Sequence, residues 1–412
     1  MIKHFLKILL ISCLSIPAYS QTIATFDVTL TKPTSGLSVP AKLNLDEFTF
    51  PGDSSLALFE ITGNKKTPIP VQIMNGECRE LYWLIYEGGV QKHTYQLVQS
   101  APKKSAEIVA DNSEGSITFK ANNKNLLRYQ YATLYPPAGI DTNYKRSGFI
   151  HPVWTPHGQE LTRIQAPDHY HHYGIWNPWT HVLFEKDTVD FWNLKDKKGT
   201  VRFANFTEVI SGEVFSEFSA LHQHVVFKKD GPEKIALNEL QTVRLYNPQP
   251  NSNYYIADIT SELNCATDSP VLILAYRYAG LGWRTTEYWN DANCEVLTSE
   301  GKTRDNTDGS KGRWAIVQGA LPEDESGGIA FLSYPANFNH PEPMRIWVKG
   351  TNKRGDMFFN FAPTKDRDWL LEPGKTYMLK YRLVVFSGKL NAAEAESAWQ
   401  YFEKPVIPEI RR

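Results

Sequence analysis

Residues 377–386 read Tyr-Met-Leu-Lys-Tyr-Arg-Leu-Val-Val-Phe, the clearest strand signal in the chain. Apolar and aromatic side chains recur at every second position, as they do in a β-strand that buries one face. That face carries Tyr377, Leu379, Tyr381, Leu383 and Val385, with Lys380 and Arg382 on the other. The segment just before it, Glu-Pro-Gly-Lys at 372–375, is typical of a turn. The pattern predicts a β-strand near the carboxyl end of the chain.

Similar runs of β-branched and aromatic residues, separated by Gly, Pro, Asn and Asp, recur along the 412 residues. The other strand candidates are residues 116–120, 182–184, 201–206, 239–246, 254–263 and 328–333. The clearest helix signal covers 391–402, where apolar residues have helical spacing between an Asn391 cap and Pro405. The sequence therefore predicts an all-β antiparallel fold with one helix near its carboxyl end.

A polar stretch between residues 103 and 115 is the best candidate for a junction between domains. It divides the chain into a small N-terminal β portion over 21–115 and a larger β domain over 116–390. The C-terminal helix and tail then occupy 391–412. A mature chain of this length buries a large core.

Residues 1–20 have the composition of a signal peptide: Lys3 and Lys7, an apolar run, and small residues at Ala18 and Ser20. A rival interpretation takes Cys13 as a lipoprotein acylation site, which would leave a very short apolar region. No later stretch approaches the roughly twenty apolar residues of a membrane helix. We therefore expect a periplasmic or secreted protein with no membrane partner.

The charge balance argues against nucleic acid as a partner. Without Lys3 and Lys7, 42 basic residues face 45 acidic ones, a net charge of −3. A chain that close to neutrality lacks the basic surface that phosphate backbones require. The sequence carries no signal for a particular oligomeric state.

Three cysteines remain after cleavage of the first twenty residues: Cys78, Cys265 and Cys294. An oxidising compartment permits a disulfide, and Cys265 with Cys294 is the better pair because both lie in one β-rich region. One thiol is then left over. No CxxC spacing indicates structural zinc.

Histidines are concentrated in one short region. Six of the ten outside residues 1–20 lie between 151 and 181: His151, His157, His169, His171, His172 and His181. The centre of the group is Asp168-His169-Tyr170-His171-His172-Tyr173. If this segment is a strand, His169, His171 and Tyr173 share one face, and Asp168, Tyr170 and His172 share the other.

Two kinds of chemistry fit this cluster. His169, His171 and His172 could ligate a divalent transition metal, with Asp168 outside the ligand shell. Alternatively no cofactor is required, and His169, His171, Tyr170, Tyr173 and His151 act as acid–base groups near neutral pH. Spacing alone favours neither, so both interpretations remain open at this point.

Residues around the cluster suggest how an acidic sugar could be bound. Arg146 lies just after Tyr144, and an arginine there suits a carboxylate or sulfate. Arg313 is a second candidate, and the loop with His340 could close on the same cleft. Tryptophans such as Trp176 offer flat faces for sugar rings. The predicted substrate-binding residues are Arg146, Arg313, Trp176, Tyr144 and His340.

Over residues 127–388 the chain resembles a family of secreted proteins of unknown function, the PmoA-like proteins often labelled methane oxygenase. The blocks that carry the resemblance are residues 128–129, 136–141, 146–152, 168–176, 190–192, 312–314 and 371–374. The segment Asp-His-Tyr-His-His at 168–172 looks like the family's signature, with Tyr170 where a proline is common and Tyr173 also variable.

The methane label is set aside, because the membrane methane monooxygenase subunit needs several transmembrane helices and this chain shows none. The resemblance implies instead an antiparallel β-supersandwich over 116–390, similar to galactose mutarotases and to several polysaccharide lyase folds. It also implies a setting of glycan degradation. Such relatives suggest chemistry at a sugar ring without fixing the reaction.

Our first hypothesis is a dehydratase or β-eliminating lyase that acts on uronic-acid-containing oligosaccharides. An arginine would neutralise the sugar carboxylate, a histidine would take the proton at C5, and a tyrosine would protonate the oxygen leaving C4. One alternative is a metal-assisted glycoside hydrolase that uses Asp168, Asp190 or Glu185. The other is a glycan-binding protein without catalysis, whose binding would survive the loss of His171.

Overall fold

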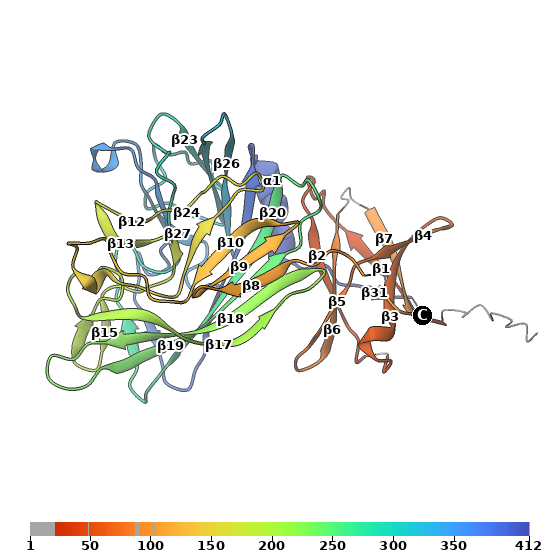
Figure 1. The fold of residues 1–412 in the computed structure, drawn as a ribbon, viewed down its shortest axis with the longest axis horizontal. Helices are drawn as coiled ribbons and strands as arrows, with labels where there is room; N and C mark the ends of the chain where they lie inside the picture. The colour runs from red at the N-terminus through yellow and green to blue at the C-terminus, as the bar shows by residue number, and fades with distance from the viewer. Residues whose placement is uncertain (1–20, 48, 87–90, 103, 412) are drawn as a thin grey trace, which may run out of the picture.

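The computed structural model describes residues 21–47, 49–86, 91–102 and 104–411. The expected signal peptide, residues 1–20, lies outside the described residues. The chain forms an all-β antiparallel β-supersandwich with one C-terminal helix, as the sequence predicts. Figure 1 shows this large part joined to a smaller N-terminal β portion.

Two large antiparallel sheets make up the supersandwich. In sheet order, the eight strands of the first are β17 (Gly199–Ile210), β18 (Phe215–Val226), β19 (Lys234–Tyr246), β20 (Tyr254–Cys265), β30 (Tyr377–Ser387), β26 (Ser326–Ser333), β25 (Trp314–Ala320) and β23 (Cys294–Thr298). The nine strands of the second are β24 (Lys311–Gly312), β27 (Glu342–Ile346), β28 (Phe358–Phe361), β22 (Gly282–Arg284), β14 (Ile175–Trp176), β11 (Phe149–Val153), β10 (Lys124–Gln130), β9 (Ser116–Ala121) and β8 (Val109–Ser113). Because β8 belongs to this sheet, the sheet begins slightly before the predicted boundary at 116.

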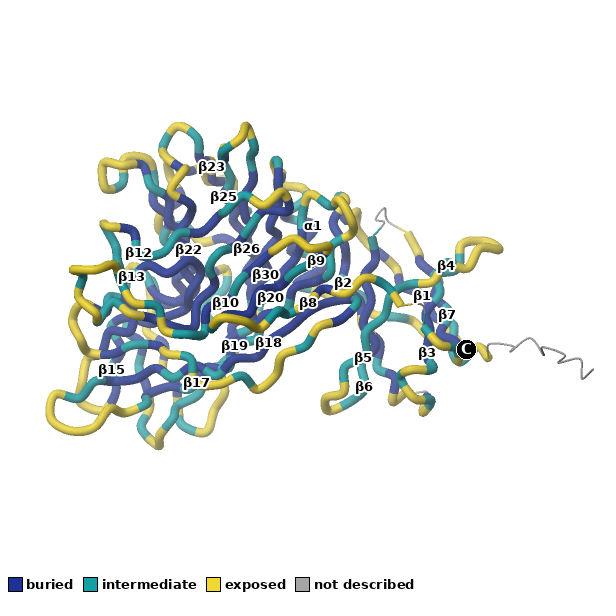
Figure 2. The backbone as a smooth tube through the Cα atoms, in the orientation of Figure 1, coloured by how far each residue is buried: buried dark blue, intermediate teal, exposed yellow. Residues whose placement is uncertain are grey.

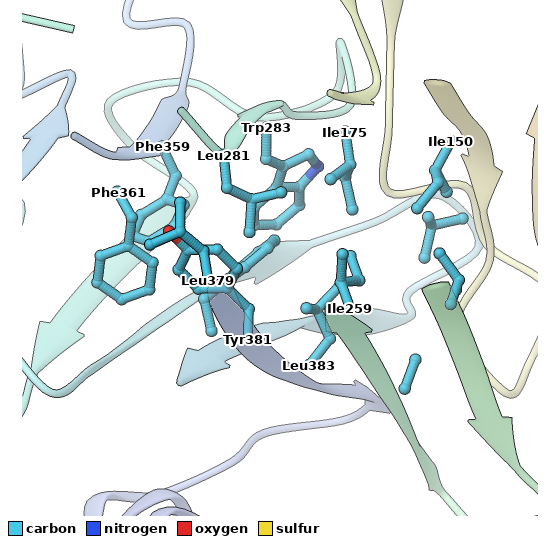
Figure 3. Packing of buried hydrophobic residues seen from close by; sticks show 14 of the residues in the cluster. Ile150, Ile175, Ile259, Leu281, Trp283, Phe359, Phe361, Leu379, Tyr381 and Leu383 are labelled. Atoms are coloured by element: carbon cyan, nitrogen blue, oxygen red, sulfur yellow. The ribbon is translucent and has the colours of Figure 1, made fainter. Parts of the chain in front are cut away.

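The main hydrophobic core lies between these two sheets. In Figure 3, Ile175, Trp283 and Phe359 of the nine-stranded sheet pack against Ile259, Leu379 and Leu383 of the eight-stranded sheet. Figure 2 shows the central strands of both sheets as largely buried, with the exposed residues in the connecting loops and in the edge strands β17 and β8. Burial of this apolar area, at about 25 cal/mol per Å², drives the sheets together.

Strand β30 is covered on both of its faces. Leu379, Tyr381, Leu383 and Val385 enter the main core, which is the face that the alternating pattern predicts. The opposite face is covered by helix α1 (Ala392–Glu403), against which Val384 and Phe386 pack. Arg382 on that face is buried. Its Nε and Nη2 atoms donate to the Asp258 carboxylate at 2.7 and 2.8 Å.

Helix α1 begins where the sequence predicts. The Asn391 side chain accepts hydrogen bonds from the backbone of Ala393 and Glu394, and the Glu394 side chain accepts from the Asn391 backbone. This capping box satisfies N–H groups that a helix start otherwise leaves unpaired. Ala395, Ala398 and Phe402 then face the sheet.

The N-terminal portion has two sheets and its own core. One contains β31 (Glu409–Ile410), β1 (Gln21–Leu30), β7 (Gln91–Gln99), β3 (Leu56–Thr62) and β4 (Lys65–Ile69); the other contains β2 (Val39–Asn44), β6 (Arg79–Ile85) and β5 (Gln72–Asn75). Strand β31 comes from the C-terminal tail and pairs with β1, so the two ends of the described chain meet here.

Two small sheets lie at the end of the supersandwich away from the N-terminal portion. One contains β16 (Asp187–Val189), β15 (Val182–Phe184), β21 (Val271–Ile273) and β29 (Trp369–Leu371); the other is the hairpin of β12 (Ile164–Ala166) and β13 (His169–Tyr173). The remaining elements are the short 3-10 helices η1 (Asp53–Ser55), η2 (Thr142–Tyr144) and η3 (Thr351–Lys353). Within the described ranges, no helix is long and apolar enough to cross a membrane.

The expected disulfide between Cys265 and Cys294 is wrong, since both thiols are free. Cys265 ends β20 and Cys294 begins β23, four strand spacings away in the same sheet. At about 4.8 Å per spacing this is far beyond the roughly 6 Å between Cα atoms of a disulfide. The Cys265 thiol donates instead to the Leu371 carbonyl at 3.3 Å, and Cys294 is buried in the core.

The core also contains a buried carboxyl group, Glu342 of β27. It accepts hydrogen bonds from Ser333 Oγ at 2.6 Å, Asn337 Nδ2 at 2.8 Å and Tyr381 Oη at 3.0 Å. Burial outweighs these three bonds and raises the pKa of Glu342 to about 7 from a usual value of 4.5. The Glu342 carboxyl therefore stays protonated in the folded state at a pH where the same carboxyl is ionised in the unfolded chain.

This group should make stability fall as the pH rises. Its contribution is complete below pH 4.5 and is lost progressively as the pH rises to about 7, because the folded state binds the extra proton over that window. Glu342→Gln keeps the shape of the side chain and one hydrogen-bond acceptor. We expect this variant to lack the decrease in the free energy of unfolding that the Glu342 carboxyl causes between pH 4.5 and about 7. Urea unfolding of both proteins across this window measures the difference. Parallel stability curves for the two proteins would contradict the assignment.

Candidate functional site

The hairpin of β12 and β13 carries the histidine cluster. Its strands pair Ala166 with His169 and Ile164 with Tyr173, with an irregular register between these pairs. Gly174 follows at φ +55°, and a Cβ there would lie 2.2 Å from the Ile150 carbonyl oxygen. The absence of a side chain therefore lets the hairpin run directly against β11.

The rings of His169, His171 and His172 come together. Their centroids are 5.3 Å apart for His169 and His171, 4.5 Å for His169 and His172, and 4.7 Å for His171 and His172. One nitrogen from each ring lies within 4.8 Å of those of the other two. Strict alternation, which would place His172 on the opposite face, is wrong here because the hairpin is short and irregular in register.

A cavity of about 560 Å³ opens on these rings. Of the residues that the sequence singles out, Tyr144, Asp168, His169, Tyr170, His171 and His172 line it. The rings of Tyr144 and Tyr170 lie 5.8 Å apart on its wall. We call the three imidazoles together the histidine wall.

Two predicted residues lie behind the wall instead of in the cavity. Arg146 is buried and its Nη2 donates to the Phe191 carbonyl at 2.8 Å. Burial lowers the pKa of Arg146 to about 10. Trp176 packs against His172 with ring centroids 5.1 Å apart. Both residues support the histidine wall from within the core.

Tyr173 and His151 also point away from the cavity. The Tyr173 hydroxyl donates to the Tyr144 carbonyl at 2.5 Å and accepts from Gln165 Nε2 at 2.7 Å. Burial raises the pKa of Tyr173. His151 lies on β11 with Nδ1 2.9 Å from Thr162 Oγ1, and burial lowers the pKa of its ring to about 4.

Arg313 and His340 lie together in a different part of the molecule, beside helix α1. Arg313 Nη2 pairs with Glu396 at 3.1 Å, and its guanidinium lies 4.8 Å from the Trp399 ring. The His340 ring is stacked on the same Trp399, 6.3 Å between centroids. The His340 loop therefore does not close on the cavity, and neither residue is a binding residue of this site.

The cavity is lined by three cations that sequence reasoning missed: Lys195, Arg277 and Arg345. Arg345 forms an ion pair with Asp308. Within the described part of the chain, Lys195 and Arg277 have no carboxylate within salt-bridge distance. The three come from separate loops and strands, so no local sequence pattern could have grouped them.

Aromatic residues complete the lining. Trp192, Tyr278, Trp347 and Phe358 contribute rings, with Trp347 5.2 Å from His169 and Phe358 5.0 Å from His172. The Tyr278 hydroxyl donates to Asn193 Oδ1 at 3.0 Å, which fixes that ring at the rim. Flat apolar faces beside polar groups suit a sugar ring.

Asp168 holds the hairpin in place through ion pairs with one buried and one exposed arginine. Its carboxylate accepts from Arg284 Nη2 at 3.1 Å, from Arg354 Nη2 at 2.6 Å and from His169 Nδ1 at 2.5 Å. Asp356 joins the network by accepting from Arg284 Nη2 at 2.7 Å. Burial works to raise the pKa of Asp168, but the His169 bond and the two guanidinium charges outweigh it and hold that pKa well below its usual range.

Burial also keeps the other two imidazoles neutral. It is the main cause that lowers the pKa of His171 to about 3 and the pKa of His172 well below its usual value, and the neighbouring rings add to it. Both rings therefore present lone pairs at neutral pH. Lone pairs of this kind can accept a proton weakly or ligate a metal ion.

Loss of the Asp168 charge should destabilise the protein. Asp168→Asn leaves Arg284, which is 1% exposed, with one ionised partner in place of two. We expect a loss of about 2–3 kcal/mol in the free energy of unfolding, measured by urea denaturation.

The matched control for this change is Asp305→Asn. Asp305 pairs with Lys349 at 3.2 Å, but the two side chains are 61% and 50% exposed. An exposed pair contributes only about 0–1 kcal/mol. Equal losses in the two variants would contradict a buried, stabilising role for Asp168.

Comparisons with known proteins place the chain in a family without defining its reaction. Among solved structures it is similar to a mutant of heparan sulfate lyase HepC from Pedobacter heparinus, at 10% identity and a TM-score of 0.34. The similarity covers 71% of this chain and 38% of the lyase, so the chain spans well under two thirds of that enzyme. A similarity this distant assigns neither reaction nor substrate. No curated protein matches the sequence. The model of a family of unknown function, DUF6807, matches residues 116–400, and the chain belongs to that family.

Proposed function

We propose that the protein is a carbohydrate-active lyase that eliminates across C4 and C5 of a uronic acid in an oligosaccharide, releasing water or a sugar from C4. One observation carries the proposal. A single cavity is lined by Lys195 and Arg277, by the tyrosines Tyr144 and Tyr170 and by the histidine wall. Elimination from a uronate needs positive charge at the carboxylate, a proton acceptor and a proton donor.

The lining favours an anionic sugar over a neutral one. Lys195 and Arg277 line the cavity as exposed side chains, and neither has an ion-pair partner among the described residues, so both are free to pair with a substrate carboxylate. The volume, about 560 Å³, lies within the range of small-ligand pockets, roughly 300–1,000 Å³. The half-buried ring of Tyr278 offers a face on which the sugar ring can lie, and the buried Trp347 ring lies behind it in the lining.

We assign the proton transfers to Tyr170 and Tyr144. Tyr170 acts as its phenolate: it takes the proton from C5, the electron pair of that C–H bond forms the C4=C5 double bond, and the bond between C4 and its oxygen breaks. Tyr144 gives its proton to that oxygen. His171 is a poor candidate for the base because its pKa of about 3 makes it a weak proton acceptor. Tyr173 is excluded because its hydroxyl faces Tyr144 O and Gln165.

Metal-assisted glycoside hydrolysis is the weaker alternative. Hydrolysis of a glycosidic bond ordinarily uses two carboxyl groups, one on each side of the bond. Asp168 is the sole carboxylate among the described residues that line the cavity, and Arg284, Arg354 and His169 occupy it. Glu185 pairs with Lys228 and Lys234 outside the cavity.

Export of the protein is part of the proposal. A signal peptide over residues 1–20 would deliver the lyase to the periplasm or the exterior. Oligosaccharides released from a polysaccharide would reach it there. Edman sequencing of the protein recovered from the producing cell would locate the first residue, which we expect at or near Gln21.

Incubation of the mature protein with a panel of sulfated and unsulfated uronic-acid oligosaccharides tests the reaction. We expect the ultraviolet absorbance of a C4=C5 double bond conjugated to the carboxylate to rise. Loss of one water in the product mass identifies a dehydratase, and chain cleavage identifies an ordinary lyase. No absorbance change with any uronate would contradict the proposal, and binding without turnover would favour a glycan-binding protein.

The roles of the tyrosines are tested by three matched substitutions. Tyr170→Phe should lower kcat by about 10²-fold or more, because one acid–base group is removed. Tyr173→Phe should keep its activity and lose only about 1 kcal/mol of stability. Tyr288→Phe, at an exposed tyrosine outside the cavity, serves as the control. Activity lost in Tyr173→Phe but kept in Tyr170→Phe would reverse the assignment.

A further inference from the structure

We infer that His169, His171 and His172 ligate one divalent transition-metal ion, with an open coordination position that faces the cavity. The inference about the ion stands on the geometry of the three rings. The role of the open position, to take the carboxylate of the sugar, rests on the function proposed above.

The spacing of the ring nitrogens suits a metal centre. One nitrogen from each imidazole lies within 4.8 Å of the other two. In a tetrahedral zinc site with Zn–N bonds of about 2.0–2.1 Å, ligand nitrogens are roughly 3.3 Å apart. The three side chains come from one strand, which limits how far they can separate.

Hydrogen bonding leaves these nitrogens available. Among the described residues, no ring nitrogen of His171 or His172 forms a hydrogen bond to protein, and Nδ1 of the buried His172 has no partner. His172 is enclosed by Phe358, Trp176 and His169 at ring separations of 5.0, 5.1 and 4.5 Å. Buried polar atoms nearly always have a partner. A metal ion bound by the three rings would provide this missing partner for the imidazole nitrogens.

Asp168 has the position of a residue that orients a metal ligand. It accepts the Nδ1 proton of His169 at 2.5 Å, which leaves Nε2 of that ring as the lone-pair nitrogen. Arg284 and Arg354 fix the carboxylate in turn. Metal-binding histidines commonly donate their second nitrogen to a carboxylate in this way, so the network outside the three rings is that of a metal site.

Three protein ligands and an adjoining cavity make an open site instead of a closed structural one. Imidazole ligands suit zinc, copper, nickel, cobalt and iron(II) better than magnesium or calcium. A divalent ion there would add positive charge to a cavity that Lys195 and Tyr170 also line. A uronate carboxylate at the open position would have its charge neutralised, and the proton at C5 would become more acidic.

Metal binding to the mature protein tests the inference without any substrate. The protein is stripped with a chelator, titrated with zinc in a calorimeter, and analysed for bound metal by mass spectrometry. We expect one zinc per chain and a rise in Tm on addition of zinc. Cobalt(II) in place of zinc should give the visible absorption of a low-coordinate nitrogen site.

Two substitutions in the cluster and one control outside it locate the site. His171→Ala and His169→Ala, both at half-buried positions, should weaken zinc binding at least 10-fold and abolish the zinc-dependent rise in Tm. His157→Ala should bind one zinc normally, because His157 is exposed and pairs with Glu325 at 3.1 Å. Circular dichroism of each variant checks that it is folded.

The outcomes separate this inference from the proposed function. No stoichiometric binding of zinc, cobalt, nickel, copper or iron(II), or equal binding by His171→Ala and the parent protein, would overturn the metal site. Turnover of uronates by the fully stripped protein would support the proposed lyase activity and would show that the ion takes no part in the reaction. Tight metal binding without turnover of any uronate would support the metal site and overturn the proposed lyase activity.

Discussion

The ion pair between Asp168 and Arg284 is the interaction on which the site depends. Arg284 ends β22 inside the nine-stranded sheet and is 1% exposed, whereas Asp168 is in the turn of the β12–β13 hairpin. Charges buried this deeply must be paired, so Arg284 draws in Asp168 and Asp356 together. The pair thereby fastens the hairpin to the sheet, and the same carboxylate orients the His169 ring.

The rest of the architecture supplies a rigid platform for this small hairpin. Two large sheets enclose the main core, and the separate cluster that contains Phe149, Trp176 and Phe358 packs between the hairpin and the nine-stranded sheet. Behind the histidine wall, Arg146 and Trp176 fill the space between the hairpin and the sheets. A cavity on such a base presents its cations, phenols and imidazoles in fixed positions, which limits the reorganisation needed during a reaction.

Much of the fold could be predicted from periodicity, because strand 377–386 and helix 391–402 are governed by local rules of alternation and capping. The histidine cluster can also be predicted from the sequence, because its histidines lie close together along the chain. The cations of the cavity cannot be predicted in this way, since Lys195, Arg277 and Arg345 are brought together only by the tertiary fold. The prediction that Arg313 and His340 bind substrate is wrong for the same reason, because the tertiary fold places both against the Trp399 ring of α1. The predicted disulfide between Cys265 and Cys294 is wrong because proximity in a β-rich sequence does not determine the order of strands in a sheet.

A crystal structure of the zinc-loaded Tyr170→Phe variant with a bound uronic-acid oligosaccharide would test the central claim most directly. The account predicts anomalous scattering from one ion among His169, His171 and His172, with the sugar carboxylate against that ion and Lys195, and C5 facing residue 170. A sugar bound beside α1 near Arg313 and His340, with three unoccupied imidazoles in the cavity, would contradict both the site and its chemistry.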